Sequence, residues 1–187
     1  NAGVYIDTVT FTDVTGNYKN TIKNVKSTIN QANAVSVLTG YSVVFDGQPH
    51  TATGMATGVL GEDLSAGLDL SSTTHTNVGI YNDTVTYTDG TGNYNNASKV
   101  VKSYILKATV TVTGDGLNGS GYFGAFDGQP HAATATVTGV GGVVLGQLTS
   151  STTHTNVGIY SDTVTYTDQT GNYKNDSKVL KSYIIAS

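Results

Sequence analysis

The chain repeats its own sequence, and this repetition constrains its fold more than any other feature. The segment TNVGIYNDTVTYTD at 76–89 returns almost unchanged at 155–168, and a third copy, NAGVYIDTVTFTD, starts at Asn1. A second marker, FDGQPH, occurs at Phe45 and at Phe126. Repeats spaced by about 75 to 80 residues are typical of a linear array of small domains. They disfavour an enzyme, because a catalytic site usually needs one asymmetric set of residues.

Alignment of the copies divides the chain into three segments. Residues 1–31 correspond to the C-terminal half of a repeat, and residues 32–107 and 108–187 correspond to two full repeats. The chain therefore opens inside a repeat, which indicates a piece of a longer protein whose targeting signals would lie elsewhere. No stretch of this sequence has the length and apolarity of a membrane span.

Composition disfavours several functional classes. The 187 residues are 37% hydrophobic and 12% charged, with no Cys. Such a chain is too rich in apolar residues for disorder, and the absence of Cys excludes disulfides, thiol nucleophiles and thiolate metal sites. The formal net charge is −4, and all nine basic residues are Lys. We expect no nucleic-acid partner, because such binding needs a basic surface and favours Arg at phosphates.

The repeated segments alternate apolar and polar residues at a period of two, which predicts half-buried β-strands. Tyr81, Val85 and Tyr87 fall on one face of such a strand, and Asn82 falls on the other. The turn cluster DGTGNYNN at 89–96 is followed by a second alternating segment, SKVVKSYIL. The two segments and their turn therefore predict a β-hairpin.

The number of such strands indicates the fold class. Further strands are expected at 109–113 and 132–140, and no amphipathic helix is evident. Several short strands per repeat, with turn signals about every 8 to 12 residues, predict an all-β fold of tandem immunoglobulin-like β-sandwich repeats. β-Grasp-like repeats are the alternative. Sandwiches joined with almost no linker would make a stiff rod.

Several sequence blocks, in order, resemble a known class of repeat. FDGQPHTATGMATGVLGEDL, TTHTNVGIYNDTVTYTDGTGNYNNAS and YILKA recur with changes in both full repeats, and residues 1–31 match the second half. This arrangement resembles the MBG-type (YDG-like) tandem repeats of large bacterial surface adhesins. The resemblance implies an extracellular, cell-surface stalk or adhesin region without catalytic residues. The second full repeat departs from the pattern at 139–148 and carries an insertion, GDGLNGSGYFGA, before Phe126.

An Asp and a Lys recur 16 residues apart in every copy. The pairs are Asp7 with Lys23, Asp83 with Lys99, and Asp162 with Lys178. A hairpin centred on the Thr-Gly-Asn turn would bring the members of each pair roughly opposite each other. They predict either a cross-strand salt bridge or, where the Lys amine is desolvated, an isopeptide cross-link to an Asn or Asp side chain.

The histidines recur in the same way, as His50 with His75 and His131 with His154. A His beside a Thr hydroxyl and a Gln amide is suited to act as general base for an ester cross-link. The alternative is turn chemistry within DGQPH, where Asp, Gly and Pro each favour a turn. Two His without a third ligand make a poor zinc site.

The acidic turns are weak candidates for calcium. Three Thr-Gly-Asn turns place side-chain oxygens close together, at Asp13 to Asn17, Asp89 to Asn93 and Asp168 to Asn172, and the main candidates are Asp89, Asn93, Asp168 and Asn172. Each turn supplies one carboxylate, whereas Ca²⁺ takes about six to eight oxygen ligands. An ordinary Asx-type turn is the alternative, and we expect no dedicated metal site and no cofactor.

These observations predict a structural protein and not an enzyme. The segment is expected to act as a stiff spacer and in adhesion within an extracellular adhesin, stalk or filament, in contact with neighbouring repeats of the same chain. The alternative is a module that binds host or surface glycans or proteins through exposed aromatic residues, for which the candidates are Tyr94, Tyr122, Phe123 and Tyr173. Residues 1–31 lack the first strands of a repeat, so either preceding residues or a neighbouring chain, by strand addition, would complete them.

Overall fold

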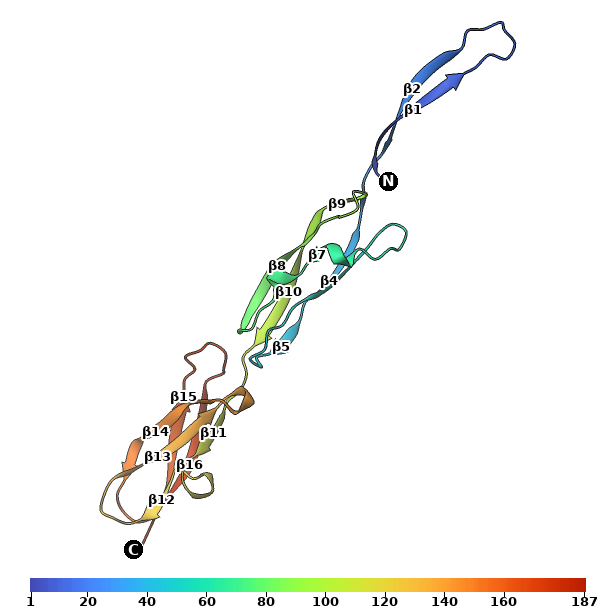
Figure 1. Ribbon diagram of the computed structural model, residues 1–187. Coiled ribbons are helices and arrows are strands. Elements are labelled where there is room, and N and C mark those ends of the chain that lie inside the picture. Colours follow the sequence, from blue (N-terminus) through green and yellow to red (C-terminus); the bar gives the residue numbers. More distant parts are fainter. The chain divides into compact units, whose positions relative to one another are not determined.

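The computed structural model describes residues 1–187, and the fold is all-β, as the sequence predicts (Figure 1). Helical structure is limited to four 3₁₀ turns of three residues each, η1 Ser65–Gly67, η2 Ser71–Thr73, η3 Leu117–Gly119 and η4 Val140–Gly142. None of them has the length or apolarity of a membrane-spanning helix.

The chain divides into two compact units, which are described separately. Unit 1 comprises residues 1–40, 51–74 and 82–102, and unit 2 comprises residues 41–50, 75–81 and 103–187. The strands β8 Gly79–Tyr87 and β10 Ala97–Leu106 run through both units. The predicted repeat 32–107 therefore contributes residues to each unit.

Unit 1 begins with a hairpin of two long strands, β1 Gly3–Phe11 and β2 Thr21–Ile29. They form a two-stranded antiparallel sheet in which Asp7 lies opposite Val25 and Val9 opposite Lys23. All residues of both strands except Gly3 are exposed. The alternating pattern of the sequence is thus present, but neither face of this hairpin is covered.

The rest of unit 1 forms short strands around a small core. These strands are β3 Ala32–Asn33, β4 Val35–Thr39, β6 Thr53–Thr57, β7 Leu68–Asp69 and β9 Tyr94–Asn95. β4 pairs with β6, β3 pairs with β9 in parallel, and β7 pairs with β8. Its buried residues fall in two clusters, Ala52, Val85 and Val101 in one and Ala56, Tyr87 and Tyr94 in the other.

Unit 2 contains two three-stranded sheets. Its strands are β5 Ser42–Val44, β11 Thr111–Gly114, β12 Tyr122–Ala125, β13 His131–Thr138, β14 Val144–His154, β15 Gly158–Tyr166 and β16 Asp176–Ile185. One sheet has the order β11-β13-β14 and the other the order β12-β16-β15. β11 and β13 confirm the strands that the sequence predicts near 109–113 and 132–140.

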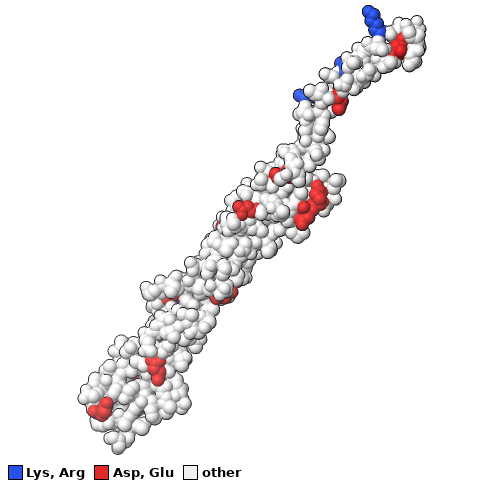
Figure 2. Space-filling view, viewed as in Figure 1, with Lys and Arg blue, Asp and Glu red and all other residues white.

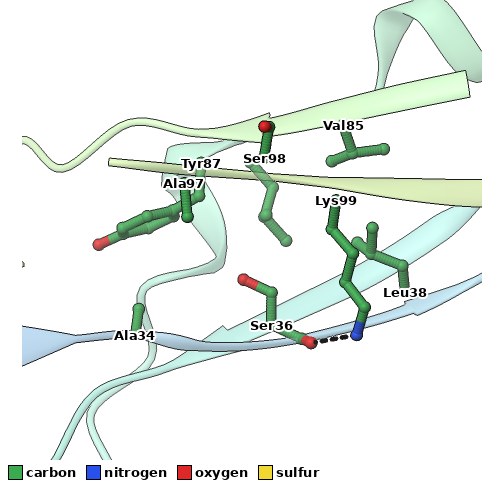
Figure 3. A pocket seen from close by; sticks show the side chains of 9 residues that line it. Ala34, Ser36, Leu38, Val85, Tyr87, Ala97, Ser98 and Lys99 are labelled. Atoms are coloured by element: carbon green, nitrogen blue, oxygen red, sulfur yellow. Dashed lines mark hydrogen bonds between the residues drawn. The ribbon is translucent and has the colours of Figure 1, made fainter. Parts of the chain in front are cut away.

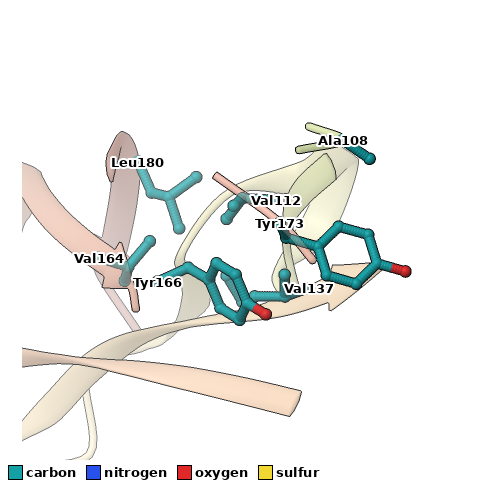
Figure 4. Close-up of a cluster of buried hydrophobic side chains, with 8 residues drawn as sticks. Ala108, Val112, Val137, Val164, Tyr166, Tyr173 and Leu180 are labelled. Carbon is teal, nitrogen blue, oxygen red and sulfur yellow. The ribbon is translucent and has the colours of Figure 1, made fainter. Parts of the chain in front are cut away.

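A single hydrophobic cluster lies between these two sheets (Figure 4). Val112 and Val137 come from one sheet, and Val164, Tyr166 and Leu180 come from the other. Every second residue of β15 is buried from Asp162 onward, while the threonines between them are exposed. The two-residue period of the sequence therefore directs one face of the hairpin β15–β16 into the core.

Candidate functional site

The Thr-Gly-Asn turns are built in the same way in all three copies. Asp168 Oδ1 accepts the backbone N–H of Thr170 at 3.0 Å and its hydroxyl at 2.8 Å, and Oδ2 accepts the N–H of Tyr173 at 3.0 Å. Gly171 occupies a positive φ of 83°, which favours glycine. The same bonds are made by Asp13 and Asp89 in their own turns. The turn is thus fixed by its own sequence.

These hydrogen bonds keep the turn carboxylates ionised. Partial burial raises the pKa of Asp168, but bonds from Thr170 and Tyr173 outweigh it and lower the pKa to about 2. The pKa of Asp89 is likewise lowered to about 2 against desolvation. At Asp13, where the bond from Tyr18 is the largest cause, the pKa is also about 2.

The structure does not assemble a calcium site from Asp89, Asn93, Asp168 and Asn172. Both oxygens of each turn carboxylate already accept N–H or O–H donors of the turn. The nearest cation at Asp168 is the Lys107 ammonium, 3.9 Å from Oδ2. No group of three or more His, Cys, Asp or Glu side chains is placed to hold a metal ion. Asx-type turn chemistry accounts for these residues.

The asparagine of the second and of the third turn accepts a backbone N–H of the preceding segment with its side chain, and a backbone N–H at the start of its own repeat with its carbonyl. In unit 1, Asn93 Oδ1 accepts the N–H of Ala2 at 2.8 Å, and its carbonyl accepts the N–H of Ala32 at 2.9 Å. The Gln31 amide also donates to the Gly92 carbonyl at 3.1 Å. We call this arrangement the Asn-turn contact.

The Asn-turn contact recurs in unit 2 with the equivalent residues. Asn172 Oδ1 accepts the N–H of Val78 at 2.9 Å, and its carbonyl accepts the N–H of Ala108 at 3.0 Å. Asn172 also donates its side-chain N–H to Asn77 Oδ1 at 3.2 Å. Phe45 packs edge-on against Tyr173, with ring centroids 5.5 Å apart. The contact therefore combines directed hydrogen bonds with aromatic packing.

Two of the predicted ligand-stacking residues are corrected by their burial. Tyr94 and Tyr173 are each only 5% exposed, because both rings pack into the core next to their turn. The Tyr94 hydroxyl bonds to Glu62 and accepts the N–H of Val59, and the Tyr173 hydroxyl accepts the N–H of Val140. Neither ring presents a face to a ligand.

The other two aromatic candidates lie beside the insertion of the last repeat. Tyr122 stacks on His131, with ring centroids 4.1 Å apart, so one of its faces is occupied. Phe123 is 43% exposed and lies 6.2 Å from the ring of Tyr183. Phe123 and Tyr183 line a hollow of about 420 Å³, whose wall also includes Leu117, whereas Tyr122 is not part of this wall. Phe123 is therefore the predicted stacking residue that remains available.

The Asp–Lys pairs are corrected by the register of the hairpins. Asp162 lies opposite Leu180, and Asp7 lies opposite Val25, in each case two residues away from the predicted Lys. The reason is that these hairpins are centred on the glycine of the turn, one residue later than a centre on the threonine. The Lys178 ammonium instead donates to the Val112 carbonyl at 2.5 Å.

Lys99 behaves like Lys178. Its ammonium donates to the Ser36 carbonyl at 3.1 Å (Figure 3). Both lysines thus reach across to a strand of the opposite sheet and hydrogen-bond its backbone. They tie β10 to β4 and β16 to β11, and neither is directed at the Asp with which the sequence pairs it.

Asp162 is the centre of a buried polar cluster that the sequence reading missed. The residue is 2% exposed, and its carboxylate accepts the Thr152 hydroxyl at 2.8 Å, His154 Nε2 at 2.8 Å and the Ser182 hydroxyl at 3.0 Å. Tyr160 stacks on the imidazole, with centroids 3.8 Å apart. Burial raises the pKa of Asp162, but the bonds from His154, Thr152 and Ser182 outweigh it, so the pKa is lowered. The Thr-x-His sequence before each Asn-Val-Gly was the available signal.

The histidines of FDGQPH take part in turn chemistry. Asp46 Oδ1 accepts the N–H of Gln48 at 2.9 Å and contacts His50 Nε2 at 2.9 Å, and Asp127 repeats this with Gln129 and His131. Hydrogen bonds from the Gln48 backbone and from His50 lower the pKa of Asp46. The paired histidines are neighbours through their backbones, since His50 and His75 form a β-bridge. They are not part of a metal cluster.

A cavity of about 180 Å³ lies in unit 1 between β4 and the strands β8 and β10 (Figure 3). Leu38, Val85 and Tyr87 form its apolar wall, and Lys99 and Ser36 stand at its polar side. In the last repeat the positions of the lining residues Ala34 and Ser36 hold Val110 and Val112, of which Val112 is buried in the core and Val110 packs against it. The cavity therefore results from smaller side chains in the covering strands.

Charge on the visible surface is sparse (Figure 2). Acidic groups occur singly or in small groups, and no continuous basic area appears on this face. The nine lysines are outnumbered by thirteen acidic residues.

No protein-family model and no curated protein matches this chain. Its function is therefore inferred from the repeats, the Asn-turn contacts and the hydrogen-bonded clusters described above.

Proposed function

We propose that the chain is a structural repeat segment of an extracellular cell-surface adhesin, stalk or filament, in which it acts as a stiff spacer and in adhesion. The observation that carries this proposal is the Asn-turn contact, which equivalent residues form twice. A contact that recurs at each repeat, built from local turns, suits an array whose length grows by adding units. Such an array can act as a spacer without a binding pocket.

The chemistry of the Asn-turn contact supports a defined orientation between consecutive segments. Asn172 uses its side-chain oxygen, its side-chain amide and its backbone carbonyl in three separate hydrogen bonds. The turn that presents Asn172 is held by Asp168, so the residue is pre-organised and little entropy is lost when the contact forms. The two side-chain bonds reach Val78 and Asn77 of the preceding repeat, whereas the carbonyl bond to Ala108 lies within the last repeat. Two bonds in different directions restrict rotation more than one bond can.

The two stacked sheets of residues 108–187 support the immunoglobulin-like version of this proposal. Each sheet has three strands, and no α-helix crosses either one. This arrangement favours a β-sandwich over a β-grasp-like repeat. The resemblance to MBG-type repeats of bacterial adhesins supports the location at the cell surface. Binding to a surface would come from many copies of the repeat or from another part of the protein, and the segment would have no catalytic role.

The proposal is tested by measuring how rigidly the Asn-turn contact holds its two sides. The chain has no Cys, so Gln48→Cys and Gln169→Cys place one spin label on each side of the contact in unit 2. Pulsed electron–electron double resonance should give a narrow distribution of distances between the two spin labels, and Asn172→Ala should broaden this distribution. Asn17→Ala, at the equivalent turn of the first hairpin, is the control and should change nothing. A broad distribution in the parent chain would contradict the stiff-spacer function.

A second function, glycan binding, is favoured by one observation, the exposed Phe123 beside Tyr183. An aromatic ring at the edge of a hollow is suited to stack on the apolar face of a sugar. A glycan array probed with the intact chain and with Phe123→Ala tests this function. Binding that is lost in the variant supports it, and an array without bound glycans contradicts it.

A further inference from the structure

The hairpin β1–β2 carries a face that the same sequence buries elsewhere in the molecule. We call it the hairpin face, and it consists of Tyr5, Asp7, Val9, Phe11, Lys23, Val25, Ser27 and Ile29. The equivalent residues of β15–β16 are Tyr160, Asp162, Val164, Tyr166, Lys178, Leu180, Ser182 and Ile184. The two hairpins have the same register, so the two faces correspond position by position.

Apart from the half-buried Tyr183 on the outer face, burial differs on this face only. Val9 is 57% exposed whereas Val164 is 1% exposed. On the opposite face, Ile6 is exposed, and so is Ile159, which belongs to the outer face of β15. The outer faces are thus alike in the two hairpins, and the hairpin face alone lacks a covering layer. An uncovered apolar sheet face of this kind marks an interaction surface.

The structure also shows what covers such a face. In unit 2 the segment 108–155 supplies the sheet β11-β13-β14, whose Val112 and Val137 pack against Val164 and Leu180. The same segment supplies β12, which adds to the edge of β16 in parallel. Apolar contact and strand addition are therefore combined in one covering segment.

Polar groups of the covering segment match polar groups of the hairpin. Thr152 and His154 both bind Asp162, and the Val112 carbonyl accepts the Lys178 ammonium. The hairpin β1–β2 already makes the one bond of this arrangement that lies within the hairpin. Ser27 donates to Asp7 Oδ2 at 3.3 Å, as Ser182 does to Asp162. Asp7 Oδ1 and Lys23 occupy the positions that would receive the remaining partners.

We propose that the hairpin face of β1–β2 is the docking surface for a polypeptide segment of the 108–155 type. Such a segment has alternating apolar residues in three strands, a strand carbonyl opposite Lys23, and a Thr-x-His sequence whose hydroxyl and imidazole bind Asp7. The partner is thus the first half of a repeat, recognised by the same contacts that close the last repeat. This inference rests on the equivalence of the two hairpins and is independent of the spacer function.

The test adds a fluorescently labelled polypeptide of sequence 108–155 to the intact 1–187 chain. Fluorescence anisotropy should show saturable binding. Hydrogen exchange followed by mass spectrometry should show amides of 3–11 and 21–29 exchanging at least about tenfold more slowly when the probe is bound. Absence of binding, or protection elsewhere without protection of these strands, overturns the proposal.

Matched variants separate docking on the hairpin face from general stickiness. Val9→Lys places a charge on the hairpin face and should weaken binding at least about tenfold. Ile6→Lys places the same charge on the outer face of the same strand and should leave binding unchanged. Equal losses in both variants overturn the proposal. Both residues are exposed in the free chain, so neither change is expected to unfold it.

Two further measurements identify the polar recognition and the source of the partner. A probe carrying His154→Ala should bind more weakly than the parent probe, because Asp7 then loses its imidazole partner. An unchanged affinity contradicts the role of Asp7. Sedimentation of the chain without probe should show a monomer, and dimers that Val9→Lys dissolves would instead assign the surface to a second copy and overturn the proposed partner.

Discussion

The hairpins β1–β2 and β15–β16 have related sequences and the same register, yet only the second has a buried face. The difference between them is the segment 108–155, which covers β15–β16 and has no counterpart over β1–β2. Strand formation, pairing and turn geometry are therefore local properties of this sequence. The hydrophobic core and the polar cluster around Asp162 belong to the pairing of two half-repeats.

The largest effect expected from this comparison is on the core valine. Val164→Asp places an unpaired charge among apolar side chains and should destabilise residues 108–187 by more than about 4 kcal/mol. Val9→Asp, the same change on the uncovered face, should alter stability by less than about 0.5 kcal/mol. Urea unfolding followed by tyrosine fluorescence measures both. Similar losses for the two variants would show that β1–β2 is covered in solution.

The second effect concerns the carboxylate at the centre of the buried cluster. Asp162→Asn replaces an acceptor of three hydrogen bonds by a group whose amide faces donors, and should cost about 2 kcal/mol. Asp7→Asn should cost almost nothing, since Asp7 is exposed and accepts one side-chain bond, from Ser27. Chemical denaturation of each variant gives the comparison. A loss at Asp7 as large as at Asp162 would contradict the role assigned to the covering segment.

The third effect concerns the side chains with which the covering strand packs against a hairpin. Ser36→Val restores the side chain found at Val112 and fills part of the 180 Å³ cavity, so unfolding of residues 32–107 should become about 1 kcal/mol harder. Val112→Ser is the reciprocal change and should destabilise the last repeat. A scanning calorimeter resolves both shifts. Destabilisation by Ser36→Val would mean that the cavity holds water bound to the Ser36 hydroxyl.

Sequence patterns predicted the local features of this fold well. The strands, the hairpins and the face that holds Val85 and Tyr87 follow from the two-residue period, and the structure confirms them. The Asp–Lys pairing was wrong by two residues because the turn is centred on its glycine, which the alternation of side chains does not reveal. Register depends on turn geometry, and turn geometry is only indirectly encoded.

Contacts between distant segments were beyond reach of the sequence. The alternation placed Asp162 with the apolar residues, but its partners Thr152 and His154 come from another strand of another sheet. Likewise, Tyr94 and Tyr173 follow turn residues in the sequence, which predicts exposed rings, but in the structure both rings are buried. Only three-dimensional packing distinguishes an aromatic ring that is buried in the core from one that is exposed and free to contact a ligand.

The smallest expected difference lies in the turns, and it tests the claim that they form without a covering segment. The pKa values of Asp13 and Asp168 are both about 2, although one turn ends an uncovered hairpin and the other a buried one. Because each folded pKa lies below the ordinary value of 3.8, these carboxylates contribute stability above about pH 4 and lose it as the pH falls toward 2. NMR titration of the two carboxyl carbons should therefore give nearly superimposable curves.

A matched change shows which bonds fix these titrations. Thr15→Val and Thr170→Val each remove one hydroxyl donor to the turn carboxylate and should raise the pKa of Asp13 and Asp168 by similar amounts. An ordinary pKa for Asp13 in the parent chain would show that the first turn is unformed without a covering segment. In that case the covering half-repeat would order the turn as well as the core. The turn would then count as structure that depends on long-range contacts, and not as a local property of the sequence.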